Sequence, residues 1–284
     1  MRGRPLLFRK VAIVGVGLIG GSVGMAIKKE QLAREVVGYS RRHSSLQEAL
    51  SKGAIDMAAH DLHQALDGSD FVVLATPVKS VIGLFSMMSR HLKRGALVMD
   101  VGSTKANIVS AAQRELPNHV SFVGAHPLAG SEKKGVAFAS AELFQNSVCI
   151  MTPTSQTSPV AQERVKVFWT SIGASVKVLS PLEHDRYLAH ISHLPHLLSY
   201  ALMSATPDES FSLLTPSFRE ITRIASSDPE LWADICMTNN RNILQALDSF
   251  TKVLSTYRKA IISKDHNLLL EGFKKAKTKK DAIS

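Results

Sequence analysis

A glycine-rich turn near the start of the chain constrains its fold more than any other stretch. Residues 11–14, Val-Ala-Ile-Val, form an apolar run typical of a short buried strand, and Gly15, Gly17 and Gly20 follow in the spacing G-x-G-x-x-G. An apolar stretch of helical length then continues to Lys29. Strand, glycine turn and helix in this order are the context that a dinucleotide-binding turn requires. The sequence therefore predicts a dinucleotide-binding unit at this end of the chain.

The positions of this turn have separate roles in holding a dinucleotide. Gly15 permits the tight turn after the strand, Gly17 lets a pyrophosphate approach the backbone, and Gly20 lets the helix pack closely on the strand. Leu18 and Ile19 lie in the first turn of the helix, whose free N–H groups and dipole favour phosphate. We therefore assign these five residues to the cofactor site.

Composition limits the remaining possibilities. The chain has 284 residues, 45% hydrophobic and 20% charged, which is typical of globular proteins and favours two domains. Its two cysteines, Cys149 and Cys236, are too few for a disulfide framework and favour a cytoplasmic location. Basic residues precede the apolar run at residues 11–27, but glycines interrupt it and no small-residue cleavage site follows. We therefore expect neither secretion nor membrane insertion.

The formal net charge is +10, from 34 Lys+Arg against 24 Asp+Glu. The positive charge outside the C-terminal lysine run is compatible with an anionic substrate and a phosphorylated cofactor. We do not expect nucleic-acid binding, because no recognised motif or interleaved aromatic residues accompany the charge. Part of the excess falls in a C-terminal run that we expect to be a solvated, frayed end: Lys274, Lys275, Lys277, Lys279 and Lys280.

Residues 30–179 alternate between short apolar runs and segments of helical length, the pattern of a parallel, doubly wound sheet. Ligands of such sheets bind beyond the carboxyl ends of the strands. Thr76 and Pro77 lie at the end of one predicted strand and Ser103 follows another, so we place all three at the cofactor. Ser103 or Thr104 is also the predicted N-cap of the next helix, which alone would explain Ser103. The predicted strands are Glu35–Tyr39, Asp70–Thr76, Ala96–Asp100, Val120–Gly124, Ser147–Met151 and Ser175–Leu179.

The residues after the second strand bear on the form of the cofactor. A carboxylate about 20 residues beyond the glycines usually binds the ribose 2′-hydroxyl of NAD. Here the strand is followed by Ser40, Arg41 and Arg42, with no acid and two guanidinium groups where a 2′-phosphate would lie. Two solvent-facing arginines at the start of the next helix are an equal alternative. The cofactor is thus NAD or NADP, with a local preference for NADP.

A histidine stands in an unusual loop predicted at Ala125–Gly135, after the strand Val120–Gly124. His126 would lie just past the strand end, held by Pro127, where the nicotinamide is expected. An imidazole has a pKa suited to taking a proton from a hydroxyl group. A surface histidine is the alternative, so position alone leaves catalysis by His126 open.

From Ser180 onward the apolar residues follow a helical period, and no strand pattern recurs. We therefore predict a nucleotide-binding domain at residues 1–179 and a helical substrate and dimerisation domain at residues 180–284. Pro195 is expected to kink a helix. Asp228 and Pro229 are predicted to start another, and a long amphipathic helix at Asn239–Ile262 suggests packing between subunits.

Two groups of polar residues in this region, four histidines and two arginines, could form a metal site or a carboxylate-binding site. We expect no metal, because the spacing of His184, His190, His193 and His196 matches no known motif and no cysteine ligand accompanies them. Packed or hydrogen-bonded histidines are the preferred interpretation. Arg219 and Arg223 are four residues apart on a predicted helix and suit a bidentate carboxylate clamp.

Five stretches of the chain, in a fixed order, carry a family likeness. They are Val14–Ser22, Asp100–Lys105, Gly124–Lys133, His184–Asp185 with Ser192–His196, and Phe218–Pro229. Over nearly its whole length the chain resembles the prephenate/arogenate dehydrogenases of tyrosine biosynthesis. The first stretch alone is generic, whereas the five in this order are highly specific.

The resemblance implies a Rossmann-like N-terminal domain and an all-helical C-terminal domain that forms a homodimer. It also implies oxidative decarboxylation of a dianionic substrate. A hydride would leave the hydroxyl-bearing ring carbon for the nicotinamide, and the carboxylate at the opposite ring carbon would leave as carbon dioxide. Prephenate would give 4-hydroxyphenylpyruvate, and arogenate would give tyrosine.

The same resemblance implies roles for individual residues. His126 would bind the ring hydroxyl and take its proton, and Ser103 would hold this hydroxyl and the nicotinamide in register. Arg223 would bind a substrate carboxylate, His196 would line the substrate pocket, and Glu132 would lie at its mouth in a charge network.

The chain departs from the family's sequence pattern at two positions, and two other functions are alternatives to the one that the resemblance implies. Many family members carry Asp where this chain has Ser40, which puts NAD preference in doubt, and Glu220 stands where Asp is common. A β-hydroxyacid dehydrogenase of similar plan would use a lysine and would not need His126. A non-catalytic dinucleotide sensor would not need His126, Ser103 and Arg223 together.

Overall fold

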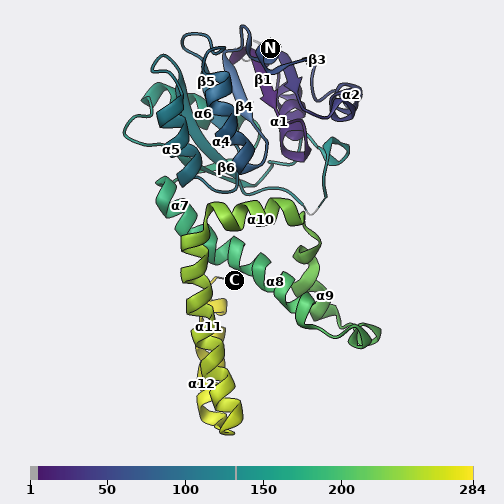
Figure 1. Cartoon of the computed structure of the whole chain (residues 1–284), viewed down its shortest axis with the longest axis vertical. Coiled ribbons are helices and arrows are strands. Elements are labelled where there is room, and N and C mark those ends of the chain that lie inside the picture. The colour runs from purple at the N-terminus through teal and green to yellow at the C-terminus, as the bar shows by residue number, and fades with distance from the viewer. Residues whose placement is uncertain (1–5, 132, 284) are drawn as a thin grey trace.

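The structure is a computed structural model that describes residues 6–131 and 133–283 (Figure 1). Every strand among these residues lies between Phe8 and Val178, and only helices follow. The strands are β1 (Phe8–Val14), β2 (Ala33–Tyr39), β3 (Met57–Ala58), β4 (Phe71–Leu74), β5 (Leu97–Asp100), β6 (Ser121–Pro127), β7 (Val148–Thr152) and β8 (Ser175–Val178). They form one eight-stranded sheet in the order β3-β2-β1-β4-β5-β6-β7-β8.

Neighbouring strands of this sheet are parallel except for β6 and β7, which pair antiparallel. The predicted fold class, a Rossmann-like sheet followed by helices, is confirmed. Three details of the prediction were wrong. The sheet was expected to be parallel, whereas β6 and β7 are antiparallel. The short strand β3 was not predicted, and β6 continues to Pro127 instead of ending at Gly124.

Helices cover both faces of the sheet (Figure 1). Side chains alternate across a strand, so Val11 and Ile13 of β1 enter one hydrophobic core while Ala12 and Val14 enter the other. One face is covered by α1 (Leu18–Lys29), α2 (His43–Ser51) and α6 (Pro159–Ser171), and the other by α3 (Leu62–Leu66), α4 (Val78–Met88) and α5 (Ala106–Glu115). The sheet is therefore buried on both sides, as parallel strands require.

The strand order reverses next to β1. This strand lies between β2 and β4. The chain first builds the sheet outward from β1 through β2 and β3, and then returns to β4 on the other side of β1. At such a switch point the connections that follow β1 and β4 lead to opposite faces of the sheet, and open α/β sheets bind their ligands in the crevice between them. Gly15 follows β1 and Thr76 lies just beyond the end of β4, which places both predicted cofactor residues at the switch point.

The remaining helices form a separate part of the molecule below the sheet (Figure 1). They are α7 (Pro181–Leu188), α8 (Leu194–Ala205), α9 (Pro216–Thr222), α10 (Pro229–Thr238), α11 (Asn240–Ile262) and α12 (His266–Asp281). Asp228 caps α10 by accepting the N–H groups of Glu230 and Leu231, as predicted. The basic C-terminal run is not frayed: its lysines lie on α12, which is helical to Asp281.

The kink predicted at Pro195 takes the form of a π-helical segment, Ala189–His193, between α7 and α8. Proline lacks the N–H that a continuous α-helix would use and its ring clashes with the preceding turn. A wider turn just before Pro195 accommodates both effects.

The helical part buries few side chains of its own. Its hydrophobic cluster contains four buried residues, Ala189, Leu194, Ile243 and Ala246. In Figure 1, α10 lies against the sheet domain, and the α11–α12 hairpin and the α8–α9 arm diverge from it. Large apolar side chains on α11 and α12 are exposed, among them Leu244, Ile261, Ile262 and Phe273.

Candidate active site

The glycine turn has the geometry that a dinucleotide requires. Gly15 has a φ of +97°, and its N–H donates to the carbonyl of Tyr39 at 2.8 Å. A Cβ on Gly20 would lie 2.0 Å from the Gly15 carbonyl oxygen, so only glycine permits this contact between helix and strand. A Cβ on Gly17 would meet nothing within 4 Å, which leaves open space over the turn. The free N–H groups of Leu18 and Ile19 in the first turn of α1 border that space, so the residues fit a pyrophosphate.

The segment after β6 lies against this turn. Gly130 is in contact range of Ile19, because a Cβ on Gly130 would meet Ile19 Cδ1 at 3.9 Å. Further along, the N–H of Ser140 donates to the hydroxyl of Ser22 in α1 at 3.0 Å. The predicted cofactor turn and the segment that begins at His126 are thus neighbours in space, although they are far apart in the sequence.

Two other predicted cofactor segments lie at the same edge of the sheet. Thr76 borders Gly15, and its Oγ1 is buried without a hydrogen-bond partner among the described residues. Pro77 is exposed at the N-cap of α4. Ser40 follows β2 and accepts the N–H of Arg42 at 3.3 Å, while the side chains of Arg41 and Arg42 are exposed. This arrangement is compatible with a 2′-phosphate and equally with two solvated arginines.

The turn that holds Ser103 rests on a buried ion pair. Lys105 Nζ contacts Asp100 Oδ2, and both side chains are fully buried. Asp100 Oδ2 also accepts the N–H of Gly102 at 2.8 Å, and Lys105 Nζ donates to the carbonyl of Ala125 at 2.8 Å. Burial raises the pKa of the Asp100 carboxyl, and the Lys105 ammonium opposes that rise. The pair joins the carboxyl ends of β5 and β6 beside Ser103.

The prediction that Ser103 or Thr104 caps the helix after β5 was wrong. Helix α5 begins at Ala106, and neither hydroxyl accepts an N–H at its start. Asp185 of α7 does so instead, with Oδ1 accepting from Lys105 N at 2.7 Å and Oδ2 from Ala106 N at 2.9 Å. A carboxylate at a helix N-terminus also interacts favourably with the helix dipole. The half-buried Ser103 side chain is therefore not used as a cap.

His126 lies within a strand and not in a loop after it, which corrects the prediction. It is part of β6 and is paired with Ile150 of the antiparallel strand β7. The extra pairing arises because β7 returns along β6, a long-range contact that the local sequence does not reveal. The backbone of His126 is consequently fixed by the sheet, and its half-buried side chain lies at the carboxyl edge.

Two residues of α7 form a hydrogen-bonded chain with His126. His126 Nδ1 lies 2.8 Å from His184 Nε2, and His184 Nδ1 lies 2.8 Å from Asp185 Oδ1. His184 and Asp185 are buried. Burial lowers the pKa of His126 well below its ordinary value, and His184 and Lys105 lower it further. Burial also lowers the pKa of His184, although Asp185 opposes this. Both imidazoles are therefore neutral near pH 7.

A third buried histidine, His193, is connected to Asp185 through Asn239. The side-chain amide of Asn239 donates to the carbonyl of Asp185 at 2.7 Å and contacts His193 Nδ1 at 3.1 Å. Burial lowers the pKa of His193 to about 4, while the backbone of Ser103 partly opposes the shift. Asn239 therefore links His193 to Asp185, close to the Ser103 turn.

One of the remaining predicted substrate residues, His196, packs against Trp232. His196 stacks on its ring with centroids 3.5 Å apart, and His193 meets the same ring edge-on at 6.1 Å. His196 donates from Nδ1 to the carbonyl of Ser192 at 2.9 Å. Burial lowers the pKa of His196, and the positive charge of Arg223 lowers it further, so the two side chains are close. Glu132 lies outside the described residues.

The paired arginines predicted on one helix are not on one helix. Arg219 belongs to α9, which ends at Thr222, and Arg223 begins a 3₁₀ turn, Arg223–Ser226. The regular i,i+4 spacing is therefore interrupted between them. Both arginines are exposed, and Arg223 lies near His196.

Sequence reasoning missed four residues around this site: Lys105, Asp185, Asn239 and Trp232. Their contacts bridge segments that are distant in sequence, such as Lys105 with Asp185 and Asp185 with Asn239. The only available signal was that three of them fall in or beside the stretches shared with the family. The hydrogen bonds of His184, His193 and His196 match the preferred interpretation of these histidines as packed or hydrogen-bonded side chains.

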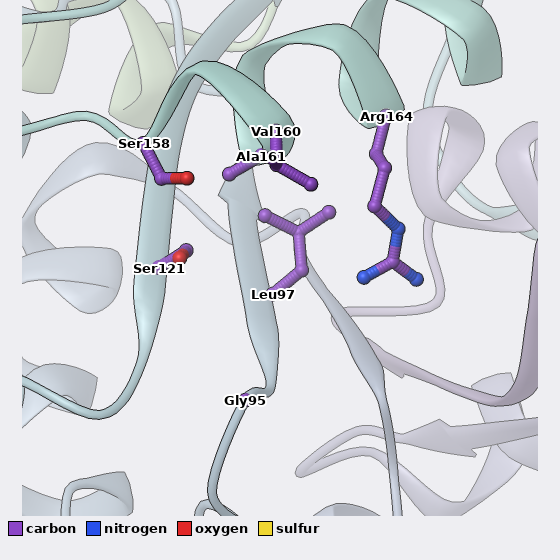
Figure 2. Close-up of a pocket in the computed structure, with 7 residues that line it drawn as sticks. All are labelled: Gly95, Leu97, Ser121, Ser158, Val160, Ala161 and Arg164. Atoms are coloured by element: carbon purple, nitrogen blue, oxygen red, sulfur yellow. The ribbon is translucent and has the colours of Figure 1, made fainter.

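A separate cavity of about 130 Å³ lies at the opposite edge of the sheet. Figure 2 shows Leu97 and Ser121, at the amino ends of β5 and β6, facing Ser158 and Arg164 of the segment around α6. Because the glycine turn and His126 lie at the carboxyl ends of the strands, this cavity is not part of the candidate active site.

Within residues 6–131 and 133–283, no three His, Cys, Asp or Glu side chains are grouped as a metal site would require. No helix in the same residues is both long enough and apolar enough to span a bilayer.

Comparison with known proteins decides the family. The sequence model of the prephenate dehydrogenase nucleotide-binding domain matches residues 23–178, and that of the prephenate dehydrogenase dimerization domain matches residues 180–275. The chain belongs to the prephenate dehydrogenase family. Cyclohexadienyl dehydrogenase of Zymomonas mobilis is 34% identical to it, over 98% of this chain and 97% of that protein.

Solved structures of this family agree in fold. The A. aeolicus prephenate dehydrogenase, crystallised with hydroxyphenyl propionate and NAD+, superposes with a TM-score of 0.91 at 32% identity, covering 99% of this chain and 100% of that one. The Synechocystis arogenate dehydrogenase gives a TM-score of 0.81 at 27% identity, with 97% and 100% covered. The predicted family is confirmed, and the chain is an NAD(P)-dependent oxidoreductase of the prephenate dehydrogenase family.

Two of the three glycines of the turn, Gly17 and Gly20, give a matched test of the dinucleotide site. Gly17→Ala adds a Cβ in open space, so we expect nearly unchanged thermal stability and weaker dinucleotide binding. Gly20→Ala places its Cβ against the Gly15 carbonyl, so stability and binding should both fall. Thermal unfolding and titration with NAD and NADP measure the two effects. Unchanged dinucleotide affinity in Gly17→Ala would contradict the site.

Proposed function

We propose that this prephenate dehydrogenase family member catalyses the oxidative decarboxylation of prephenate or arogenate, with NAD or NADP as hydride acceptor, in tyrosine biosynthesis. The observation that carries the proposal is the position of His126. A neutral imidazole, hydrogen-bonded through Nδ1 and fixed in β6, lies at the carboxyl edge of the sheet, in the strand whose following segment borders the glycine turn. A base at this point can act on a hydroxyl beside the nicotinamide.

The proposed cofactor site consists of residues at the switch point. The backbone of Gly15, Gly17, Leu18, Ile19 and Gly20 would bind the pyrophosphate, and Thr76 and Pro77 would border the cofactor beyond β4. When bound, the oxidised nicotinamide accepts the hydride from the ring carbon. The chain's own residues bind and orient both reactants.

His126 is the proposed general base. Because its pKa is lowered, the imidazole is unprotonated at neutral pH and can take the proton of the ring hydroxyl. Removing this proton helps most in the transition state, as the oxygen gains carbonyl character while the hydride leaves. The half-buried Ser103 would hold the same hydroxyl and keep the nicotinamide in register.

Three further residues, all later in the sequence than His126, are proposed for the substrate pocket. Arg223 would bind a substrate carboxylate, because its planar guanidinium suits bidentate recognition. His196, held by Ser192 and stacked on Trp232, would line the pocket. Glu132 is assigned to the mouth of the pocket from the family resemblance alone.

We further propose NADP as the preferred cofactor. Ser40 replaces the carboxylate that would bind a ribose 2′-hydroxyl, and the exposed Arg41 and Arg42 follow it directly. Their positive charge favours a 2′-phosphate at this position.

A homodimer is the proposed assembly. The region matched by the dimerization domain has only four residues in its buried hydrophobic cluster. Apolar side chains exposed along α11 and α12 offer a surface that a second copy would bury. Both cysteines are free thiols, Cys149 buried and Cys236 half-buried, which supports a reducing compartment such as the cytoplasm.

His126→Asn tests the base. We expect turnover to fall by about 10²–10⁴-fold with cofactor affinity nearly unchanged, the usual contribution of a general base. In the unchanged protein, kcat/KM should stay level as the pH falls through 6.5 and decline only in more acidic solution. The sign follows because a lowered pKa keeps the unprotonated, active imidazole to lower pH. An acid limb centred at or above 6.5, or near-normal turnover of His126→Asn, would contradict the assignment.

Arg223→Ala tests the carboxylate clamp. Loss of a charged hydrogen bond costs about 1.5–3 kcal/mol, so KM for the substrate should rise about 10–100-fold while kcat changes less. Arg219→Ala removes the same charge from an exposed position on α9 and serves as the control. An unchanged KM in Arg223→Ala, or an equal rise in both variants, would remove Arg223 from the pocket.

Steady-state kinetics on prephenate and on arogenate, each with NAD and with NADP, test the function as a whole. We expect turnover of at least one substrate and a higher kcat/KM with NADP. Replacing Arg41 and Arg42 together by alanine should raise KM for NADP and leave KM for NAD nearly unchanged. Equal effects on both cofactors would show that these arginines do not bind a 2′-phosphate.

A further inference from the structure

The hydrogen-bonded chain behind His126 fixes where each proton lies. Both oxygens of Asp185 already accept backbone N–H groups, from Lys105 and Ala106. The contact of 2.8 Å between Asp185 Oδ1 and His184 Nδ1 therefore needs a hydrogen on the histidine nitrogen. A neutral imidazole carries one N–H, so His184 Nε2 has a lone pair and acts as an acceptor.

The next contact follows from the first. His184 Nε2 lies 2.8 Å from His126 Nδ1, so the hydrogen of that bond must belong to His126. His126 is neutral as well, and its single N–H is then on Nδ1. Its other nitrogen, Nε2, is left with a lone pair and is the nitrogen not engaged by His184.

We propose that His184 and Asp185 are positioning residues that hold His126 in the tautomer protonated at Nδ1, so that Nε2 is the atom that accepts the substrate proton. This inference rests on the proposed function, in which His126 is the base. The proton leaves the substrate oxygen and bonds to Nε2, and Nδ1 keeps its own hydrogen. The bond to His184 therefore persists through the step, and the ring need not turn.

The same carboxylate also sets the position of the second proposed site residue. Asp185 caps α5, whose first residues follow the Ser103 turn directly. It is held in turn by Asn239, which donates to its main-chain carbonyl at 2.7 Å. One side chain of the helical part thus fixes the tautomer of His126 and the start of the helix after Ser103.

Two substitutions at His184 separate positioning from simple packing. In His184→Gln the amide oxygen can accept the hydrogen of His126 Nδ1, whereas in His184→Leu no acceptor is present. Both remove the imidazole and differ in whether a hydrogen-bond acceptor remains, so they form a matched pair. Thermal unfolding of both variants measures any shared structural cost.

The direct readout is the tautomer of His126, followed by long-range ¹H–¹⁵N NMR of the full chain labelled on histidine, with His126→Asn used to assign its signals. We expect the Nδ1–H form in the unchanged protein and in His184→Gln, and a mixture with the Nε2–H form in His184→Leu. Turnover should fall by about 10²–10⁴-fold in His184→Leu and by less than about 10-fold in His184→Gln, with cofactor affinity unchanged in both.

The outcomes distinguish this inference from the function on which it rests. Retention of the Nδ1–H form in His184→Leu overturns the positioning role, whatever the turnover. Equal loss of turnover in the two variants at equal thermal stability overturns it too. A shifted tautomer with unchanged turnover supports control of the ring by His184 and overturns instead the assignment of His126 as the base.

Discussion

A buried ion pair between Lys105 and Asp100 holds together the edge of the sheet on which the candidate site is built. Both side chains are fully buried, and Lys105 also binds the carbonyl of Ala125, the residue before His126. Removing one partner of such a pair typically costs about 3–5 kcal/mol, because the other charge is left buried without compensation. This ion pair therefore supports both the Ser103 turn and the strand segment that carries His126.

The candidate site lies between the sheet and the helices, and neither part contains it alone. His126 and Ser103 belong to the sheet side, whereas His184, Asp185 and the His196–Trp232 stack belong to the helices. Two ion pairs also span the boundary: Lys79 with Asp234 at 3.2 Å and Lys134 with Asp228 at 2.8 Å. Lys134 and Asp228 are partly exposed, so this pair is a weak link that salt can screen.

What the sequence could predict depends on how local the cause is. The glycine turn, the alternating strands and the Asp228 cap each arise from neighbouring residues, and the structure has all of them. The extension of β6 through His126 needs β7, which lies about 20 residues further on, and the cap of α5 comes from Asp185, 80 residues from Lys105. Such long-range partners leave no local pattern, so the sequence could propose candidate site residues but not the contacts that join them.

The π-helical segment Ala189–His193 has a consequence for how a helix can present side chains. Each residue of an α-helix advances the rotation by about 100°, so the widened turn shifts the angular phase of everything that follows it. His190 stays exposed, while His193 is buried beside Asn239 and His196 reaches Trp232. Loss of one residue from this segment would restore a regular helix and rotate His193 away from Asn239 and His196 away from Trp232. The π-helical segment therefore sets the direction in which α8 presents its side chains relative to those of α7.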